Sequence, residues 1–530
     1  MLDWLKKRFA RPEWDLASAP LPWGDEPSLA MFLEERLGLG AERLPDSGVA
    51  LPDEERVSVT DGIRFAAGAR DGIALYHMAS VEETQTAQRL VSLLRTVLAD
   101  GGLGHLPALY QALSEHRALS WVDELGPGIA RPPRPDPNRL YALALWLTTQ
   151  APDREAVKAG VAMLALLDLD ADELGLLRLL GSHDEFTLYA VVALAAQSEE
   201  PEQELWSVAR RVSGWGRIHA VQRLADTEDP RIKDWMLREG FRNDVLDRYL
   251  ALTCAVAGEL CAALAEPVDD GLLAGATALL GALLEPAGPT AGMEAWEDGG
   301  LATERWMDRL AEHPTPPLAA VPVLARMVQA AALEDGPWPL DVAPGLIARA
   351  RDLLADPRWR VRVLHELGPA GVDPDAAVAA AHALGLDTFD AWLRRLDPAD
   401  ALPWEGAISA AQDRHRLSLV LDRVGELLPA DLVAGEDRRR WAPQTVGGRV
   451  LSALLAALAA CAGLGGSHIL AGLHSPLAQH RNLALRALVG WPQTTWPEGA
   501  HEQVARLAQE DPEPSVRENA AAAWGGPADA

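Results

Sequence analysis

From about residue 138 onward, short apolar runs alternate with breaks that carry proline or glycine. Runs with this spacing place apolar side chains on one face of an α-helix. We therefore expect helices over residues 140–147, 156–167 and 172–180, and in most of the chain that follows. Proline and glycine interrupt helices and are typical of turns. The pattern predicts a long succession of short helices joined by tight turns.

One short phrase recurs within this helical part. It occupies residues 356–362 and 511–517, and a looser copy occupies residues 475–481. In each copy an arginine follows the proline by five residues, and an apolar, helix-forming run comes next. The phrase therefore predicts a turn followed by the second helix of a helical hairpin. Its spacing fits a repeat of about 40 residues with two helices in each unit.

The phrase resembles the HEAT repeat. That resemblance implies a mainly α fold, in which residues 138–530 form a HEAT-like, right-handed α-solenoid of helical hairpins. In the HEAT family, the Asp and Arg of the phrase lie on the inner helix, and the Arg bonds back to neighbouring units. Asp511 and Arg517 match this pattern, as do the equivalent residues of the first copy, whereas Ser475 and His480 depart from it. The resemblance sets no function, because such arrays serve many unrelated roles.

The first part of the chain, residues 1–125, has a different pattern. Residues 56–66 alternate apolar and polar side chains around an Asp-Gly pair, which predicts a β-hairpin. We expect a third strand over residues 72–78, and helices over about 28–37 and 81–98. These elements predict a small mixed α/β cap with linker helices.

A proline-rich segment, residues 126–137, separates this cap from the helical array. Proline fixes its own backbone and removes a hydrogen-bond donor. We therefore expect neither helix nor strand here. The segment is interpreted as a linker, or as a strap laid over the surface.

Charge and cysteine content narrow the choice of partner and compartment. The chain of 530 residues has 77 acidic and 48 basic residues, a net charge of −29. This charge opposes binding to nucleic acid and favours a basic partner. Three cysteines give no disulfide framework, and no apolar run approaches the roughly 18 residues of a membrane span. Lysine is rare and arginine common, which is typical of a bacterium with a GC-rich genome, and the odd number of cysteines suggests a reducing compartment. We therefore expect a cytoplasmic bacterial protein.

The stretch 214–244 is locally basic and rich in tryptophan. Arginine binds oxyanions in a bidentate manner, and tryptophan stacks on planar or cationic groups. The candidate binding residues of this stretch are Trp215, Arg217, His219, Arg223, Trp235, Arg238, Arg242 and Asn243. The alternative is that the tryptophans are core residues and the arginines pair with acids on adjacent repeats.

Residues 205–265 also resemble bacterial proteins catalogued as "limonene hydroxylase". That name implies terpene oxidation, which requires a haem, a flavin or a non-haem metal. The sequence contains no Gly-x-Gly-x-x-Gly after a strand, no Walker loop, no Gly-x-Ser-x-Gly and no His-Glu-x-x-His. We therefore expect no cofactor, no metal and no catalytic residues, and the residues do not support the hydroxylase label.

Tryptophan is the dominant aromatic residue, with 18 Trp against 5 Tyr and 6 Phe. Most of these residues are expected between repeats, as core. A minority flank proline-rich turns or loops, where tryptophan often acts as an interface anchor. These are Trp338, Trp404, Trp441, Trp491 and Trp496.

These observations favour a non-catalytic scaffold that binds a protein or peptide along the concave face of the solenoid. One alternative is an acidic inhibitor or immunity-type protein that masks a basic partner. Another is an enzyme or accessory protein with a small-molecule pocket near residues 215–243. A nucleic-acid-binding HEAT protein is disfavoured by the charge. The pocket hypothesis requires the eight candidate side chains to converge.

Overall fold

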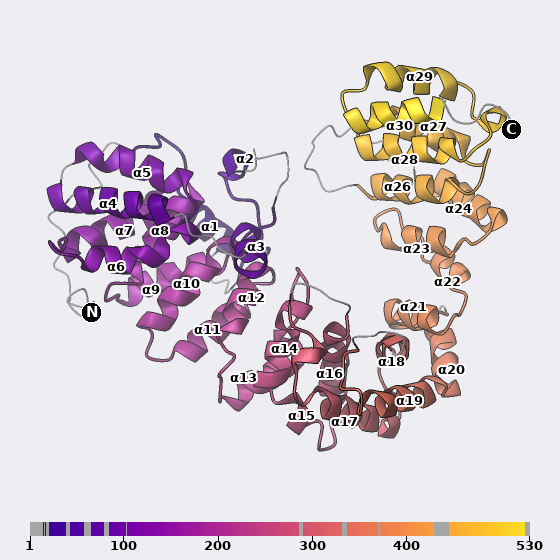
Figure 1. Cartoon of the computed structure of the whole chain (residues 1–530), viewed down its shortest axis with the longest axis horizontal. Helices are drawn as coiled ribbons and strands as arrows, with labels where there is room; N and C mark the ends of the chain where they lie inside the picture. Colours follow the sequence, from indigo (N-terminus) through magenta and orange to yellow (C-terminus); the bar gives the residue numbers. More distant parts are fainter. Residues whose placement is uncertain are drawn as a thin grey trace. The chain divides into compact units, whose positions relative to one another are not determined.

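The computed structural model shows a mainly helical protein with no β-strand among the residues it describes (Figure 1). The described residues are 14, 16, 21–38, 43–57, 65–78, 84–101, 103–285, 290–330, 336–368, 371–428 and 445–524. The chain divides into two compact units, Met1–Ala355 and Asp356–Ala530. This division lies within the stretch expected as one array.

The first unit contains nineteen numbered α-helices and several short helical turns in its described part. Its α-helices are α1 (Leu29–Leu37), α2 (Glu54–Val57), α3 (Ala69–His77), α4 (Thr84–Asp100), α5 (Leu106–Glu115), α6 (Leu125–Ala130), α7 (Pro137–Gln150), α8 (Arg154–Leu164), α9 (Ala171–Gly181), α10 (Asp184–Gln197), α11 (Pro201–Ala209), α12 (Trp215–Gln222), α13 (Pro230–Trp235), α14 (Arg248–Ala257), α15 (Leu260–Ala263), α16 (Asp270–Leu283), α17 (Gly299–Glu312), α18 (Ala320–Gln329) and α19 (Ala343–Leu354). A π-helical turn, η6 (Met236–Gly240), follows α13 directly.

The helices of this unit pack in a regular order. Helices α8, α10, α12, α14, α16 and α18 contact one another in succession. Other helices pack beside this row, among them α7 against α8, α9 and α11 against α10, and α17 against α16. Each helix buries its apolar face against neighbours that are close in the sequence, as stacked hairpins do.

The second unit repeats this kind of packing. Its described α-helices are α20 (Pro357–Glu366), α21 (Pro374–Ala383), α22 (Phe389–Arg394), α23 (Leu402–Ala410), α24 (Arg414–Leu427), α26 (Val446–Leu458), α27 (Gly466–His474), α28 (Ala478–Val489), α29 (Ala500–Glu510) and α30 (Pro514–Trp524). Helices α26, α28 and α30 contact in succession, and α27 contacts α29 beside them (Figure 1).

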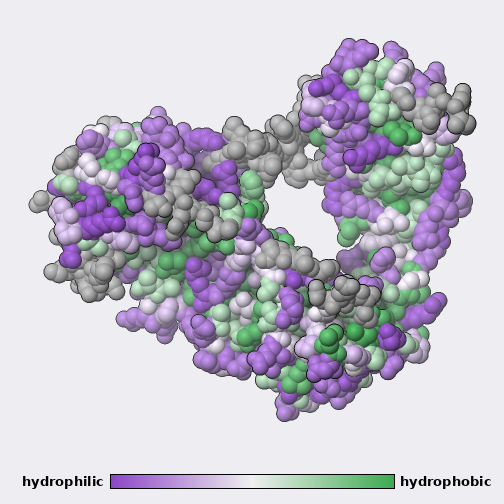
Figure 2. Space-filling model, in the orientation of Figure 1, coloured by the Kyte–Doolittle hydropathy of each residue, from purple (hydrophilic) through white to green (hydrophobic). Residues whose placement is uncertain are grey.

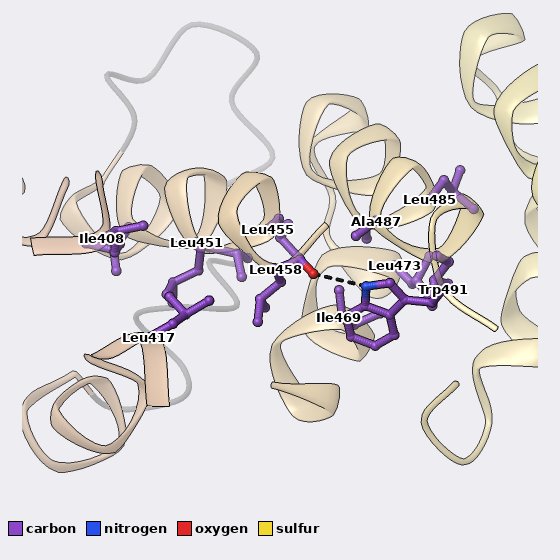
Figure 3. Close-up of a cluster of buried hydrophobic side chains, with 14 of the residues drawn as sticks. Ile408, Leu417, Leu451, Leu455, Leu458, Ile469, Leu473, Leu485, Ala487 and Trp491 are labelled. Carbon is purple, nitrogen blue, oxygen red and sulfur yellow. Dashed lines mark hydrogen bonds between the residues drawn. The ribbon is translucent and has the colours of Figure 1, made fainter. Parts of the chain in front are cut away.

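The core of the second unit runs along these helices. Figure 3 shows leucines of α26 facing Ile469 and Leu473 of α27, with Trp491 closing the cluster. The indole Nε1 of Trp491 donates to the carbonyl of Leu458 at 3.0 Å, so its polar atom is satisfied inside the core. Trp404, Trp491 and Trp496 are all buried, so the prediction that they are exposed loop anchors is wrong. Trp441 lies outside the described residues.

The recurring phrase forms the predicted turn and helix in all three copies. Helices α20, α28 and α30 begin at or within three residues of its proline. Arg481 donates to the carbonyls of Ser475 and Pro476 at 2.9 and 3.0 Å. Arg517 donates in the same way to Asp511 and Pro512, at 2.6 and 3.1 Å. In these two copies, the arginine five residues after the proline therefore closes the turn that precedes its own helix.

The N-terminal part differs from its prediction. Residues 72–78 were expected as a strand, but residues 72–77 lie in α3 and Met78 is the C-cap of this helix. A short apolar run does not distinguish strand from helix, and here the helix buries Asp71, Gly72 and Ala74 together. The expected hairpin begins in the helix α2, and residues 58–64 lie outside the described part.

The proline-rich segment also departs from its prediction, because residues 125–130 form the helix α6. Pro127 lies in the first turn of this helix, where its missing N–H costs no hydrogen bond. Arg95 of α4 donates to the carbonyls of Gly128, Arg131 and Pro133 at 2.7–2.9 Å. These bonds hold the segment against α4.

Within the described ranges, no helix combines the length and apolar character needed to cross a membrane.

Candidate functional site

The densest group of buried charges lies where the N-terminal segments meet α8 and α10. Lys158 of α8 is 1 % exposed, and its Nζ donates to Asp71 at 2.8 Å, Glu155 at 3.0 Å and Glu185 at 2.7 Å. Burial opposes the lysine charge, yet these carboxylates together raise its pKa well above the usual value. Lys158 therefore stays protonated and joins α3 to α8 and α10.

A second buried cation lies one turn earlier on α8. Arg154 donates through Nε and Nη2 to the carboxylate of Asp53 at 2.8–3.1 Å, and its backbone N–H donates to the same group at 2.9 Å. Its Nη1 lies 3.6 Å from Glu185. Burial alone would raise the pKa of Glu185, but Lys158 and Arg154 lower it to about 2. Glu185 is therefore fully ionised at neutral pH.

Asp184, the neighbour of Glu185, is a buried carboxyl group, and no cation among the described residues pairs with it. Its oxygens accept hydrogen bonds from the Ser47 hydroxyl at 3.0 Å and from the backbone N–H of Gly216 at 2.9 Å. Burial raises the pKa of Asp184 to about 7, against these hydrogen bonds, which lower it. Asp184 links the loop around Ser47 to the start of α12.

These groups form a buried charge cluster with a structural role, and we call it the lock. Its members are Asp53, Asp71, Arg154, Glu155, Lys158, Asp184 and Glu185. A general base needs a pKa near the working pH and access to substrate. Lys158 and Glu185 are held far from that range, and each is bonded to several partners. Asp184 has a suitable pKa but is 4 % exposed and faces protein donors. The cluster fixes residues 43–57 and α3 on the helices.

Two of the eight candidate residues lie beside this lock, in an aromatic cluster. The ring of Trp215 packs on α3, where a Cβ on Gly72 would approach its Cε3 to 2.1 Å. Tyr76 stacks on His219, with ring centroids 6.3 Å apart, and Tyr249 lies 5.0 Å from Trp215. Burial lowers the pKa of His219 to about 4, so the imidazole is neutral. These rings form the apolar part of the interface at which α3 packs on α12.

Three further candidates form a second neighbourhood. Arg217 donates to the carbonyls of Ala209 and Arg242, both at 3.0 Å, and its guanidinium lies 5.6 Å from the centre of the Trp235 ring. Trp235 is buried and meets Trp206 edge to face. Arg242 is exposed, and its guanidinium lies over Phe241. Through these contacts α12 is joined to α11, to the end of α13 and to the residues that follow η6.

Of the last three candidates, Arg238 and Asn243 face other surroundings. Arg223 lies near the aromatic cluster, where its charge opposes the rise that burial causes in the pKa of Tyr76 and adds to the fall that burial causes in the pKa of His219. Arg238 pairs with Asp234 at 2.8 Å and with Asp269 at 2.6 Å, joining η6 to the start of α16. Asn243 accepts from the N–H groups of Val245 and Leu246 and closes a turn. Arg223 bonds the carbonyl of His219 within its own helix. The eight residues therefore lie in separate interfaces and do not converge on one pocket.

Sequence reasoning did not find the lock. Its carboxylates are spread from residue 53 to residue 185, and only the tertiary fold brings them together. One signal was available: Lys158 is one of four lysines in the chain, and an apolar run, residues 159–164, follows it directly. His183 caps the start of α10 at Asp184 by accepting from the N–H of Glu185.

An open groove lies at the other end of the first unit, with a volume of about 760 Å³. We call it the Trp296–Trp338 groove. It is lined by Met293, Glu294, Ala295, Trp296, Glu297, Gly300, Leu301, Gly336, Pro337, Trp338, Pro339 and Val342. Trp338, expected as an exposed anchor, is 6 % exposed and contributes to this lining.

The surface around the groove combines exposed apolar residues with acidic ones. Leu340 is 88 % exposed and Leu301 45 % exposed, and Figure 2 shows hydrophobic patches among hydrophilic residues over this part of the chain. The charged residues that line the groove in the described structure are Glu294 and Glu297. An apolar floor with acidic edges suits a ligand that is apolar and positively charged.

Over the described ranges, no three His, Cys, Asp or Glu side chains are grouped so as to hold a metal ion. Comparison of the chain with protein-family models and with curated proteins finds no match.

Proposed function

We propose that this protein is a non-catalytic scaffold that binds a protein or peptide segment, built on a HEAT-like α-solenoid in the cytoplasm of a bacterium. The observation that carries the proposal is a contrast between two regions of the protein, the lock and the groove. The buried charges around Lys158 pair with one another inside the protein. The Trp296–Trp338 groove, in contrast, presents apolar and acidic groups to solvent.

The order of helix contacts supports the solenoid part of the proposal. The even-numbered helices from α8 to α18 contact one another in succession, and other helices pack beside this row. Helices α26, α28 and α30 of the second unit do the same. The bonds from Arg481 and Arg517 to their own turns repeat in neighbouring units. In a solenoid, such repetition presents one extended surface for binding.

The occupant that fits the Trp296–Trp338 groove is a segment of a partner protein with apolar side chains next to lysine or arginine. Glu297 is exposed at the groove and Leu301 is half exposed one turn further along. The chain's net charge of −29 would attract such a partner over long range. Apolar contact then supplies most of the affinity, since exposed ion pairs contribute little.

The test is capture from the native host by the tagged full-length protein at low salt, with two variants. The groove variant is Glu297→Lys with Leu301→Ser. The matched control is Glu304→Lys with Leu402→Ser, which changes the charge equally and alters a leucine of the same 45 % exposure elsewhere. One stoichiometric protein held by wild type and control, and lost by the groove variant, supports the proposal.

Two other outcomes contradict it. A partner retained equally by all three proteins places binding outside the groove. A bound small molecule in the native mass, with no protein partner, favours the enzyme or accessory-protein hypothesis.

A second candidate function is an acidic inhibitor that masks a basic protein. The groove's acidic edge and the net charge favour it. The two functions differ in salt dependence, because affinity that rests on charge falls steeply as salt screens it. A complex that dissociates between low and moderate salt indicates an inhibitor, and a complex held by apolar contact survives the wash.

A further inference from the structure

Helix α3 lies across the row formed by α8, α10, α12 and α14 and is not itself a member of that row. Together with its N-cap, it makes a hydrogen bond to each of these four helices. The bonds join Asp71 to Lys158, Gly68 to Glu185, Tyr76 to Gln222 and His77 to Tyr249. A helix of nine residues therefore covers part of one face of the row.

The chemistry of this interface differs from that between the stacked helices. Stacked helices meet mainly through leucine, alanine and valine, as in the core of the second unit. The α3 interface instead contains three of the chain's five tyrosines, one of its four lysines and the buried Trp215. Tyrosine and tryptophan are enriched where separate proteins meet. The interface of α3 therefore resembles one between two proteins more than one between repeats.

A single carboxylate lies at the centre of this interface. Asp71 is 2 % exposed and accepts from Lys158 Nζ at 2.8 Å, from the Tyr189 hydroxyl at 3.2 Å and from Arg117 Nη2 at 3.3 Å. These three donors belong to α8, to α10 and to the turn that follows α5. None of them lies on α3, so the rest of the protein supplies a complete site for one carboxylate.

The residues that follow this carboxylate define the shape that the interface accepts. Gly72 lies against Trp215, where a Cβ would approach Cε3 to 2.1 Å, so there is no space for a side chain. Four residues later, Tyr76 lies among the rings of Trp215, His219 and Tyr249. The interface therefore fits a helix with an aspartate followed directly by glycine, and with a tyrosine four residues after the glycine.

We propose that this face of α8, α10, α12 and α14 is a binding surface for a partner protein's helix with that pattern, and that α3 occupies it as an internal ligand. The surface requires a carboxylate, because Lys158 pairs with Glu155 and Glu185 and would have one N–H without an acceptor if Asp71 left. The partner's helix must displace α3, so α3 also limits access. The surface is separate from the Trp296–Trp338 groove and does not depend on the proposed function.

The test measures binding of a fluorescently labelled peptide of residues 65–78, which contains α3, to the full-length protein. In the wild type α3 already occupies the surface, and a tethered segment acts at an effective concentration of about a millimolar. Gly72→Leu in the protein collides with Trp215 and should release α3 while leaving the surface itself unaltered. We expect this variant to bind the peptide more tightly than the wild type does, by about tenfold or more.

The matched control is Gly175→Leu in α9, where a Cβ has no atom within 4 Å, and this protein should bind as the wild type does. A peptide with Asp71→Asn should bind the Gly72→Leu protein about tenfold more weakly, because it lacks the charge that pairs with Lys158. If circular dichroism shows that Gly72→Leu does not fold, Asp71→Asn in the full-length protein replaces it, since this change keeps the shape of α3. The proposal is overturned if the released protein binds no more peptide than the wild type, or if it binds both peptides equally.

Discussion

At the scale of single residues, the contact between Gly72 and Trp215 shows how sequence determines the docking of α3. A side chain at position 72 would occupy the same space as the indole ring, since a Cβ there lies 2.1 Å from Cε3. Glycine is normally unfavourable inside a helix. Its presence in α3 is explained by the close approach of the tryptophan, and it makes position 72 a sensitive probe of this interface.

We therefore expect Gly72→Ala to weaken the docking of α3, although alanine favours helices in general. The matched control is Gly175→Ala in α9, where a Cβ would have no atom within 4 Å. The control should be neutral or stabilising by up to about 1 kcal/mol. Urea unfolding of both variants gives the comparison, and equal stability of the two would contradict the close packing of Trp215 on α3.

Lys158 provides the second residue-scale prediction. Lys158→Met removes the one cation that pairs with all three of Asp71, Glu155 and Glu185, and breaking such a buried pair costs about 3–5 kcal/mol. The loss should shrink as the pH falls, because protonation removes the repulsion between the carboxylates. Urea unfolding at two pH values measures both effects.

The control for Lys158 is Lys233→Met. Its partners Glu228 and Glu259 are 90 % and 61 % exposed, so we expect a change of less than about 1 kcal/mol. If the two variants lose the same stability, the pairs around Lys158 do not act as a buried lock.

At the scale of elements, Asp184 ties the loop of residues 43–57 to the start of α12 through Ser47. Burial raises its folded pKa to about 7 from an ordinary value of 3.8, so the native state binds this proton more tightly than the unfolded state. The stability that Asp184 contributes is therefore complete below about pH 4 and is lost as the pH rises through 7. Asp184→Asn, which does not titrate, should lack this dependence.

Amide hydrogen exchange of residues 43–57 measures this effect. After correction for the intrinsic rate, exchange should become faster between pH 5 and pH 8 in the wild type, and stay level in Asp184→Asn. Equal pH profiles for the two proteins would show that another group controls the loop.

In the second unit, Arg481 joins α28 to the turn that precedes α30. Its guanidinium pairs with the buried carboxylate of Asp511 at 2.7 and 2.9 Å while also bonding its own turn. Arg481→Met should destabilise α28 and α30 by about 3–5 kcal/mol, because Asp511 is left buried and unpaired. Exchange rates of these two helices report the loss, and Arg423→Met, an exposed pair, should leave them unchanged.

Local structure was predictable from the sequence wherever a local signal sets it. Short-range patterns account for the start of α10 at Asp184 and for the helices after Pro357 and Pro512. A short-range pattern also accounts for the Ser28 cap of α1. The strand expected at 72–78 failed because the burial of Asp71 depends on Lys158, which lies 87 residues away. The lock and the groove could not be predicted, since their residues are adjacent only after folding.

At the scale of the whole molecule, we propose that the protein acts by binding a basic, partly apolar segment of another protein in the Trp296–Trp338 groove. This proposal is supported by the acidic chain, the succession of helix contacts and the open apolar surface near Leu301 and Leu340. The charged groups around Lys158, in contrast, are buried and do not face such a partner.

The most direct measurement is hydrogen exchange of the full-length protein with and without its captured partner. We predict slower exchange in residues 293–301 and 336–342 on binding, with little change in α8 and α10. The same protection should be absent from the Glu297→Lys, Leu301→Ser variant. Protection confined to other helices, or no protection at the groove in a stoichiometric complex, would contradict binding of the partner in the groove.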